Sequence, residues 1–395
     1  FLEGGAALSA DSQFLGNEAS QTGGALVCDR NGSLLLLRSA VASNTAVSLG
    51  GGISVQGGCA ARVEHSSLSQ CTVIRSGSPV SLGGALHCQY ASLALANTSF
   101  SGNSAATGGA VYLFFCAAAL RGALLTRGEA GEGALYSLGG ALSLADSEVS
   151  FNRGSAAGAG VVCVDGAACE LSGVAVFSNA AVELGAVSVS NTPARIEACA
   201  ITNNTSEGAA GGVYVMQAQV NVSDCEIARN RASTYGGGLA AELFSALRLR
   251  NVTLADNSAV AGGGLYLFHH VTVDLQSVTL RANRATNTGG GVYLGDYVAC
   301  QARELVMEGC GAVSGGGAYA AYTSSLQVSG LRCANNTAAY MGGGLALFNA
   351  VALSLNRSVF RGNAADMGGA LSAEYYSEVA LRDCVFENNT GEPCP

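Results

Sequence analysis

The 395-residue sequence predicts an all-β fold, a single-stranded right-handed parallel β-helix, or solenoid. Three observations predict it: a glycine motif that recurs about every 26 residues, alternating apolar residues between its copies, and an asparagine that recurs in step with the glycines. With 55 glycines, 4 prolines and 12% charged residues, the composition is typical neither of a disordered tail nor of collagen. The glycines therefore belong to a repeated structural unit.

The glycine motif reads Gly-Gly-(Gly/Ala)-(Leu/Val/Ile), and its third residue marks each copy. From residue 160 onward the copies are 26 or 27 residues apart. The marked positions are 6, 25, 52, 85, 110, 141, 160, 186, 212, 238, 264, 291, 317, 344 and 370. We expect about fifteen coils in one array over residues 1–391, and the start of a Pro/Cys-containing linker to a further domain at 392–395.

Apolar residues alternate within each coil, as in Leu247, Leu249, Val252 and Leu254. A period of two, interrupted once, predicts short strands, whereas each glycine would cost about 1 kcal/mol inside a helix. A coil this short cannot bury its own apolar face. We therefore expect each strand to pair in parallel with its copies in adjacent coils, through right-handed connections.

A second motif, apolar-x-x-Asn, places one asparagine at a bend of each coil. Asparagines stacked from coil to coil can hydrogen bond amide to amide. The predicted structural ladder consists of Asn230, Asn257, Asn283, Asn336, Asn363 and Asn389.

Together the two motifs resemble a known repeat pair. The copies that carry the resemblance are Gly-Gly-Ala-Leu at 23–26, 83–86 and 368–371, and Phe-x-x-Asn at 14–17, 100–103, 360–363 and 386–389. They resemble the repeats of the chlamydial polymorphic outer-membrane proteins, which are surface adhesins and autotransporters, and related repeats in extracellular proteins of algae and other protists. The resemblance covers nearly the whole chain and implies a β-helix at a cell surface.

Sequons and cysteines predict an extracellular, secreted glycoprotein. The chain has 14 cysteines, and the longest apolar stretch, Gly108–Leu120, is too short for the roughly 20 residues of a membrane-spanning helix. Asn-x-Ser/Thr sequons start at Asn31, Asn97, Asn203, Asn204, Asn221, Asn251, Asn335, Asn356 and Asn388.

The cysteine spacing predicts some disulfides and no metal site. No Cys-x-x-Cys pair is present, which argues against a zinc or redox centre. Successive coils place Cys199 and Cys225 at equivalent positions, and short loops separate two further pairs. The candidate disulfides are Cys199 with Cys225, Cys300 with Cys310, and Cys59 with Cys71.

Catalytic residues are expected to be absent. The chain has no lysine, and its acidic residues are scattered, although β-helix lyases and hydrolases need grouped carboxylates. The best cluster is Asp146 and Asp165, with Glu148 and Arg153 nearby. The prediction is a protein without enzymatic activity or cofactor, and a sequence pI of about 5.0 argues against nucleic acid as a partner.

An aromatic column provides a candidate interaction surface. Alternation points these residues outward from the coils, and exposed apolar ladders often mark contact surfaces. The column consists of Tyr112, Tyr214, Tyr266, Tyr293 and Tyr319, with Phe268 and Phe348 two residues further on in their coils. Cross-strand stacking alone is the other explanation for such a column.

The predicted function is that of a structural rod in a larger surface or filament-forming glycoprotein. The tyrosine-bearing sheet would pack on other copies or domains of the same assembly, with polysaccharide as an alternative partner. Two alternatives stay open, a pectin-lyase-like polysaccharide lyase or hydrolase and a carbohydrate-binding adhesin.

Overall fold

The computed structural model describes residues 2–74 and 81–391, so the predicted linker at 392–395 lies outside the described residues. The chain forms two compact units, Phe1–Arg195 and Ile196–Pro395, which are described separately. The described residues form short strands joined by turns and include no helix. The predicted all-β parallel solenoid of about fifteen coils is confirmed.

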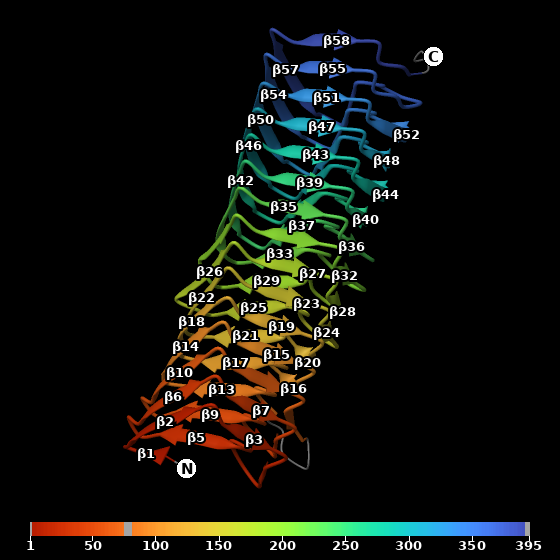
Figure 1. Ribbon diagram of the computed structural model, residues 1–395. Helices are drawn as coiled ribbons and strands as arrows, with labels where there is room; N and C mark the ends of the chain where they lie inside the picture. Colours follow the sequence, from red (N-terminus) through yellow and green to blue (C-terminus); the bar gives the residue numbers. More distant parts are fainter. Residues whose placement is uncertain (1, 75–80, 392–395) are drawn as a thin grey trace. The chain divides into compact units, whose positions relative to one another are not determined.

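In the first unit each coil contributes one strand to each of four parallel sheets, called columns A, B, C and D (Figure 1). A representative coil contains β13 (Leu86–Gln89) in column A, β14 (Ser92–Ala96) in B, β15 (Ser99–Ser101) in C and β16 (Ser104–Thr107) in D. Its β13 pairs in parallel with β17 (Val111–Phe114) of the next coil, with Leu86 opposite Val111. The same residues of successive coils thus lie next to one another.

The second unit repeats this arrangement. A representative coil contains β41 (Leu265–Phe268), β42 (Thr272–Gln276), β43 (Thr279–Arg281) and β44 (Arg284–Thr288). In the next coil, β45 (Val292–Gly295) pairs with β41, and Tyr266 lies opposite Tyr293. The alternating residues of columns A, B and C fill the interior, for example Leu267, Leu275 and Leu280, which are all buried.

The turns between columns are short because one or two residues in each have a left-handed backbone conformation. Between columns A and B the pair His269 and His270 has φ of 62° and 59°, and Ser277 and Ala282, each with φ of 53°, turn the chain at the next two corners. Turns of one or two residues leave little freedom in coil length, which accounts for the regular repeat.

In most coils a buried asparagine follows the column C strand, at the corner between columns C and D. The backbone N–H of Asn257 donates to Oδ1 of Asn283 over 3.0 Å, and Nδ2 of Asn257 donates to that same oxygen over 3.1 Å and to the carbonyl of Ile227 over 2.8 Å. A cysteine takes the asparagine's place in one coil of each unit: the N–H of Cys71 donates to Asn103 Oδ1 and that of Cys310 to Asn336 Oδ1, both over 2.9 Å. The predicted ladder residues therefore form two runs, Asn230–Asn257–Asn283 and Asn336–Asn363–Asn389.

Two copies of the glycine motif occupy a different corner from the others. Most precede column A, but Gly139 and Gly140 precede β22 (Ala141–Ala145) of column B, as Gly4 and Gly5 precede β2 (Ala6–Ala10). The column A strand of the first of these coils is β21 (Leu135–Leu138). Marking that coil at residue 141 was therefore wrong, because glycine pairs also fit the corner between columns A and B.

Disulfides are present, but not between the predicted partners. They link Cys28 to Cys59, Cys88 to Cys116 and Cys163 to Cys169, all within the first unit. Cys59 therefore does not pair with Cys71, which is buried and reduced. Cys300 and Cys310 are also reduced. Cys199 and Cys225 do not form the predicted disulfide, and the backbone N–H of Cys199 instead donates to Sγ of Cys225 over 3.3 Å.

A leucine in place of Asn257 should destabilise the second unit by about 1–3 kcal/mol, because the N–H of Asn230 and the carbonyl of Ile227 would lose buried partners. Denaturant unfolding measures this loss. The exposed Asn287 provides the matched control, and Asn287→Leu should unfold like the wild type. Equal stability of both variants would contradict the role of the asparagine column.

Candidate functional site

The predicted tyrosines all lie at the second position of column A strands, on the side that faces away from the interior. Three of them are nevertheless buried: Tyr112, Tyr214 and Tyr266 are only 6%, 5% and 9% exposed. Tyr293 and Tyr319 are half-buried, as are Phe268 and Phe348. The expectation that this column is exposed is therefore wrong for its most buried members.

The glycine turn before each column A strand covers these tyrosines. Gly262 has φ of +61°, and a Cβ added to it would lie 2.8 Å from Cβ of Tyr266. Gly108 has the same relation to Tyr112, and Gly315 has it to Tyr319. In the coil of Tyr214, Ala210 takes the place of this glycine with φ of 51°. Alternation therefore predicted the direction of the side chains but not the turn that covers them.

In the second unit the covered tyrosines form a stack. Tyr235 joins it from the turn before column A, with its ring centroid 4.4 Å from that of Tyr266. The centroids of Tyr266 and Tyr293 are 4.9 Å apart, and those of Tyr293 and Tyr319 are 5.8 Å apart, with planes within 10° of parallel. Burial raises the pKa of Tyr293 to about 12. The stack supports the structure of column A in addition to any role in binding.

A carboxyl group is enclosed beside this stack. The hydroxyl of Tyr214 donates to Oε2 of Glu242 over 2.9 Å, and Tyr235 bonds to the same carboxyl. Burial raises the pKa of Glu242 above its ordinary value, although the two phenols oppose that shift. The group is a half-buried hydrogen-bonded cluster of one acid and two phenols.

The first unit has a shorter stack, of which the sequence analysis identified only one member. His87 stacks on Tyr112 with centroids 5.8 Å apart, and Tyr112 stacks on Tyr136 at 5.5 Å. Burial lowers the pKa of His87 to about 4, so this ring is neutral at pH 7. Tyr136 was not predicted because the glycine motif of its coil was taken to be at residue 141. The spacing of 25 and 24 residues between His87, Tyr112 and Tyr136 is the sequence signal that identifies His87 and Tyr136.

Exposed aromatic residues lie instead at the corner between columns A and B. Phe244, His270 and Tyr297, here called the corner stack, occupy equivalent turn positions in three consecutive coils of the second unit. The ring of His270 lies between the other two, with centroids 5.0 Å from each and planes within 3° of parallel. Phe244 and Tyr297 are 64% and 53% exposed. The sequence analysis missed this stack, although its spacing of 26 and 27 residues was a readable signal.

A second histidine strengthens this corner. Nδ1 of His269 lies 2.6 Å from Oδ2 of Asp296 in the next coil. Exposed aromatic residues also lie at this corner in later coils, namely Tyr322, Tyr375 and Tyr376. His270 therefore stacks on aromatic residues of the adjacent coils, and His269 lies beside an acidic residue of the next coil.

The predicted acidic cluster does not form. Asp165 follows a column A strand, β25 (Val161–Val164), and accepts a hydrogen bond from Asn191 over 3.0 Å. Asp146 follows a column B strand, β22, and its Oδ2 lies 3.1 Å from Nε of Arg121. The two carboxylates lie at different corners because the glycine motif before Asp146 precedes column B, whereas the one before Asp165 precedes column A. The two residues therefore do not occupy equivalent positions in their coils.

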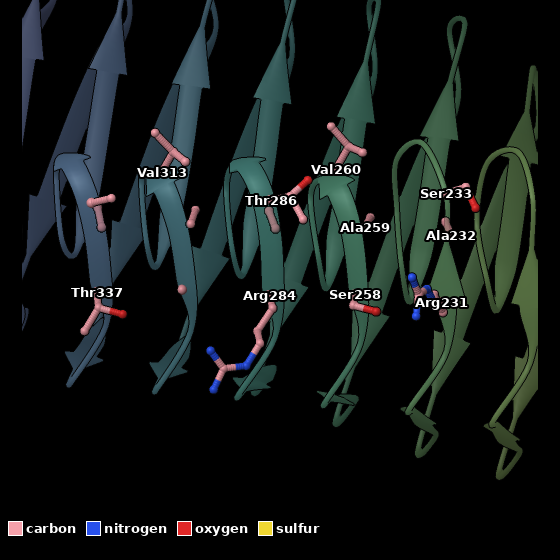
Figure 2. A pocket seen from close by; sticks show the side chains of 15 residues that line it. Arg231, Ala232, Ser233, Ser258, Ala259, Val260, Arg284, Thr286, Val313 and Thr337 are labelled. Atoms are coloured by element: carbon pink, nitrogen blue, oxygen red, sulfur yellow. The ribbon is translucent and has the colours of Figure 1, made fainter.

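A groove of about 930 Å³ runs along column D of the second unit (Figure 2). It crosses β36 (Arg231–Ala232), β40 (Ser258–Ala261), β44 (Arg284–Thr288), β48 (Gly311–Ser314) and β52 (Thr337–Met341). Figure 2 shows Arg231, Ser258 and Arg284 along one side of these strands, and Val260 and Val313 along the other. This groove was not predicted from the sequence.

Two protein-family profiles match the chain. The profile for a right-handed β-helix region matches residues 132–304, and the profile for the Chlamydia polymorphic membrane protein repeat matches residues 97–113. The chain is a right-handed parallel β-helix repeat protein similar to these repeats. The suspected resemblance is thus confirmed, and the matches indicate a surface or adhesin-like repeat protein. A comparison with curated proteins found no match.

Most sequons of this β-helix repeat protein lie at exposed positions. Six of the asparagines are exposed residues in left-handed turns: Asn31, Asn97, Asn203, Asn251, Asn335 and Asn388. Asn221 is exposed on a strand, and Asn356 is half-buried. Asn204 is buried, and its Nδ2 donates to Asn230 Oδ1 over 3.0 Å, so a glycan cannot be attached there without disrupting the asparagine column. In the described part of the chain, no helix is long and apolar enough to cross a membrane.

Replacing the buried Tyr266 should destabilise the second unit, whereas replacing an exposed ring should not. Tyr266→Ser removes a ring stacked on both sides and should cost about 3 kcal/mol or more in the free energy of unfolding. The exposed Tyr297 is the matched control, and Tyr297→Ser should change stability by no more than about 0.5 kcal/mol. Equal losses in denaturant unfolding would contradict the assigned burial.

The neutral His87 should make the first unit less stable in acid. Its pKa is about 4 in the folded protein and 6.5 ordinarily, so the unfolded chain binds the proton first and stability falls as the pH drops from 6.5 to 4. At 1.36 kcal/mol per pKa unit, the full loss is about 3 kcal/mol. His87→Phe should abolish this part of the pH dependence of thermal unfolding. The exposed His65 is the control, and His65→Asn should retain it.

Proposed function

We propose that this β-helix repeat protein is a non-enzymatic, extracellular structural element of a larger surface glycoprotein, which packs on other copies or domains of the same assembly. The corner stack of the second unit is the packing surface. This proposal keeps the predicted function but moves the surface from the covered tyrosines to the exposed aromatic corner.

The observation that carries the proposal is the exposure of Phe244, His270 and Tyr297 in three consecutive coils. Their ring faces lie against one another, so the ring edges and the two outer faces meet the solvent. Aromatic edges carry partial positive charge and pack well against the faces of other rings. Rigid, preordered aromatic residues of this kind lose little conformational entropy when a partner covers them.

Two features support a non-enzymatic role. Asp146 and Asp165 lie at different corners, each engaged by its own polar neighbour, so they do not act as an acid and a base on one substrate. Glu242 is half-buried and bonded to two phenols, which leaves it poorly placed to reach a polymer.

Disulfides and exposed sequons support the extracellular glycoprotein part of the proposal. The disulfides of the first unit are typical of an oxidising compartment. Six sequon asparagines lie at turns whose side chains face solvent, where glycans add no strain to the coils.

Sedimentation velocity over a range of protein concentrations tests the packing surface. In the triple variant Phe244→Ser, His270→Ser and Tyr297→Ser, each lost anchor removes on the order of 1–2 kcal/mol of association free energy. We expect the variant to self-associate at least tenfold more weakly than the wild type, with unchanged thermal unfolding.

The control removes three exposed apolar side chains of the second unit that lie away from this corner: Tyr340→Ser, Val359→Ser and Val385→Ser. This control should associate like the wild type. A monomeric wild type, or equal weakening in both triple variants, would overturn the corner stack as the packing surface.

A further inference from the structure

The column D groove of the second unit has a chemistry that the corner stack does not explain. Its strands place one outward residue per coil on each side, and the register sets Arg231, Ser258, Arg284, Gly311 and Thr337 side by side. The opposite side carries Ser233, Val260, Thr286, Val313 and Ala339. Small alanines lie between the two rows, so the groove has a polar, cationic side and a largely apolar side (Figure 2).

The two arginines on the polar side are exposed and have no acidic partner. Neither Arg231 nor Arg284 forms an ion pair among the described residues, whereas Arg248 pairs with Asp274 over 3.6 Å. Gly311 adds no side chain beside Arg284, and even a Cβ placed there would lie 3.9 Å from Nη1. The guanidinium of Arg284 therefore has room for a bidentate carboxylate, and that of Arg231 is open to solvent.

Acidic residues are absent from the groove lining, although the chain has 28 of them and a net charge of −9. The nearest along the chain, Asp256, lies in the turn two residues before Ser258 and makes no ion pair in the described part of the chain. Glu207 and Asp366 lie in the coils before and after the five that form the groove. In the first unit, by contrast, the equivalent row of column D contains Glu129, opposite Arg153. The groove is thus a local cationic strip on an acidic protein.

The strip repeats with the coils, which limits the shape of its ligand. Arg231 and Arg284 are two coils apart, a separation of about 10 Å from the strand spacing of about 4.8 Å. Three residues of an extended peptide, at about 3.3 Å each, also span this distance, but side chains three residues apart on a strand point to opposite faces and cannot both meet the two arginines. A linked pyranose ring spans close to one coil, so groups on every second sugar can meet both arginines. The backbone groups of the strands are also paired with adjacent coils, so a peptide cannot add as a further strand.

We propose that this groove binds an extended anionic polysaccharide that carries a carboxylate on every second sugar. Arg231 and Arg284 bind two successive carboxylates of the polymer. Ser258 and Thr337 bind hydroxyl groups, and the apolar faces of the sugar rings lie against Val260 and Val313. The low density of positive charge suits a polymer with alternating acidic and neutral sugars. The site is independent of the corner stack and adds a carbohydrate partner to the proposed assembly role.

Hyaluronan oligosaccharides, which alternate a uronate with a neutral sugar, are the probe. Isothermal titration calorimetry with the glycosylated, disulfide-bonded protein should show binding that weakens as salt increases. The double variant Arg231→Gln and Arg284→Gln should bind at least tenfold more weakly. Val260→Asp, which adds a carboxylate to the opposite side, should weaken binding by a similar factor.

Matched controls separate the site from net charge and from the packing surface. Arg250→Gln with Arg281→Gln removes two exposed arginines outside the groove and should bind hyaluronan like the wild type. The corner-stack triple variant should also bind normally, so the two proposals can fail separately. Hyaluronan whose carboxylates have been reduced to alcohols should not bind.

Several outcomes would overturn the proposal. They are no binding of hyaluronan by the wild type, equal binding by the groove double variant with unchanged thermal unfolding, and equal binding of the carboxyl-reduced polymer. Poly-glutamate that binds as tightly as hyaluronan and is lost in the same double variant would identify an acidic-peptide site instead.

Discussion

Parallel pairing of each strand with its copy in the next coil is the interaction on which the rest of the structure depends. It fixes equivalent residues about 4.8 Å apart along every column. Whatever the sequence places at one position of the coil therefore becomes a stack: Leu267 with Leu294 in the interior, Asn257 with Asn283 at the bend and Tyr266 with Tyr293 beside the glycine turn. The chemistry of this protein is consequently organised in columns that run from coil to coil.

Stacking gives each column a different physical outcome. A buried asparagine forms hydrogen bonds with backbone groups of the preceding coil and with the asparagine side chain of the next coil. One substitution therefore affects several coils. Cys310 interrupts this pattern, yet its N–H still donates to Asn336, which shows that the backbone half of the ladder survives without the amide. The tyrosine column is covered by glycine turns, whereas the aromatic residues one corner further on are left in solvent.

The same geometry explains why two surfaces of different character occur in one unit. At the corner between columns A and B, left-handed turns tolerate large side chains and display them, so aromatic rings such as His270 stack in the open. In column D the outward positions hold small or cationic residues, so a groove lies between two rows. The proposed packing surface and the proposed carbohydrate site therefore share no residues.

The sequence by itself determined the solenoid, the number of coils, the parallel strands and the asparagine positions, because glycine spacing, alternation and Asn spacing are local and recur along the whole chain. It also predicted disulfides, but not their pairing. The tertiary structure alone decided which face was covered: alternation directs Tyr266 away from the interior, but burial depends on how closely Gly262 turns back over the ring. It also decided the register of Asp146 and Asp165, since glycine pairs fit two different corners, and it brought Arg231 and Arg284, 53 residues apart in the chain, to one side of a groove. Those outcomes depend on contacts between coils, which no single repeat specifies.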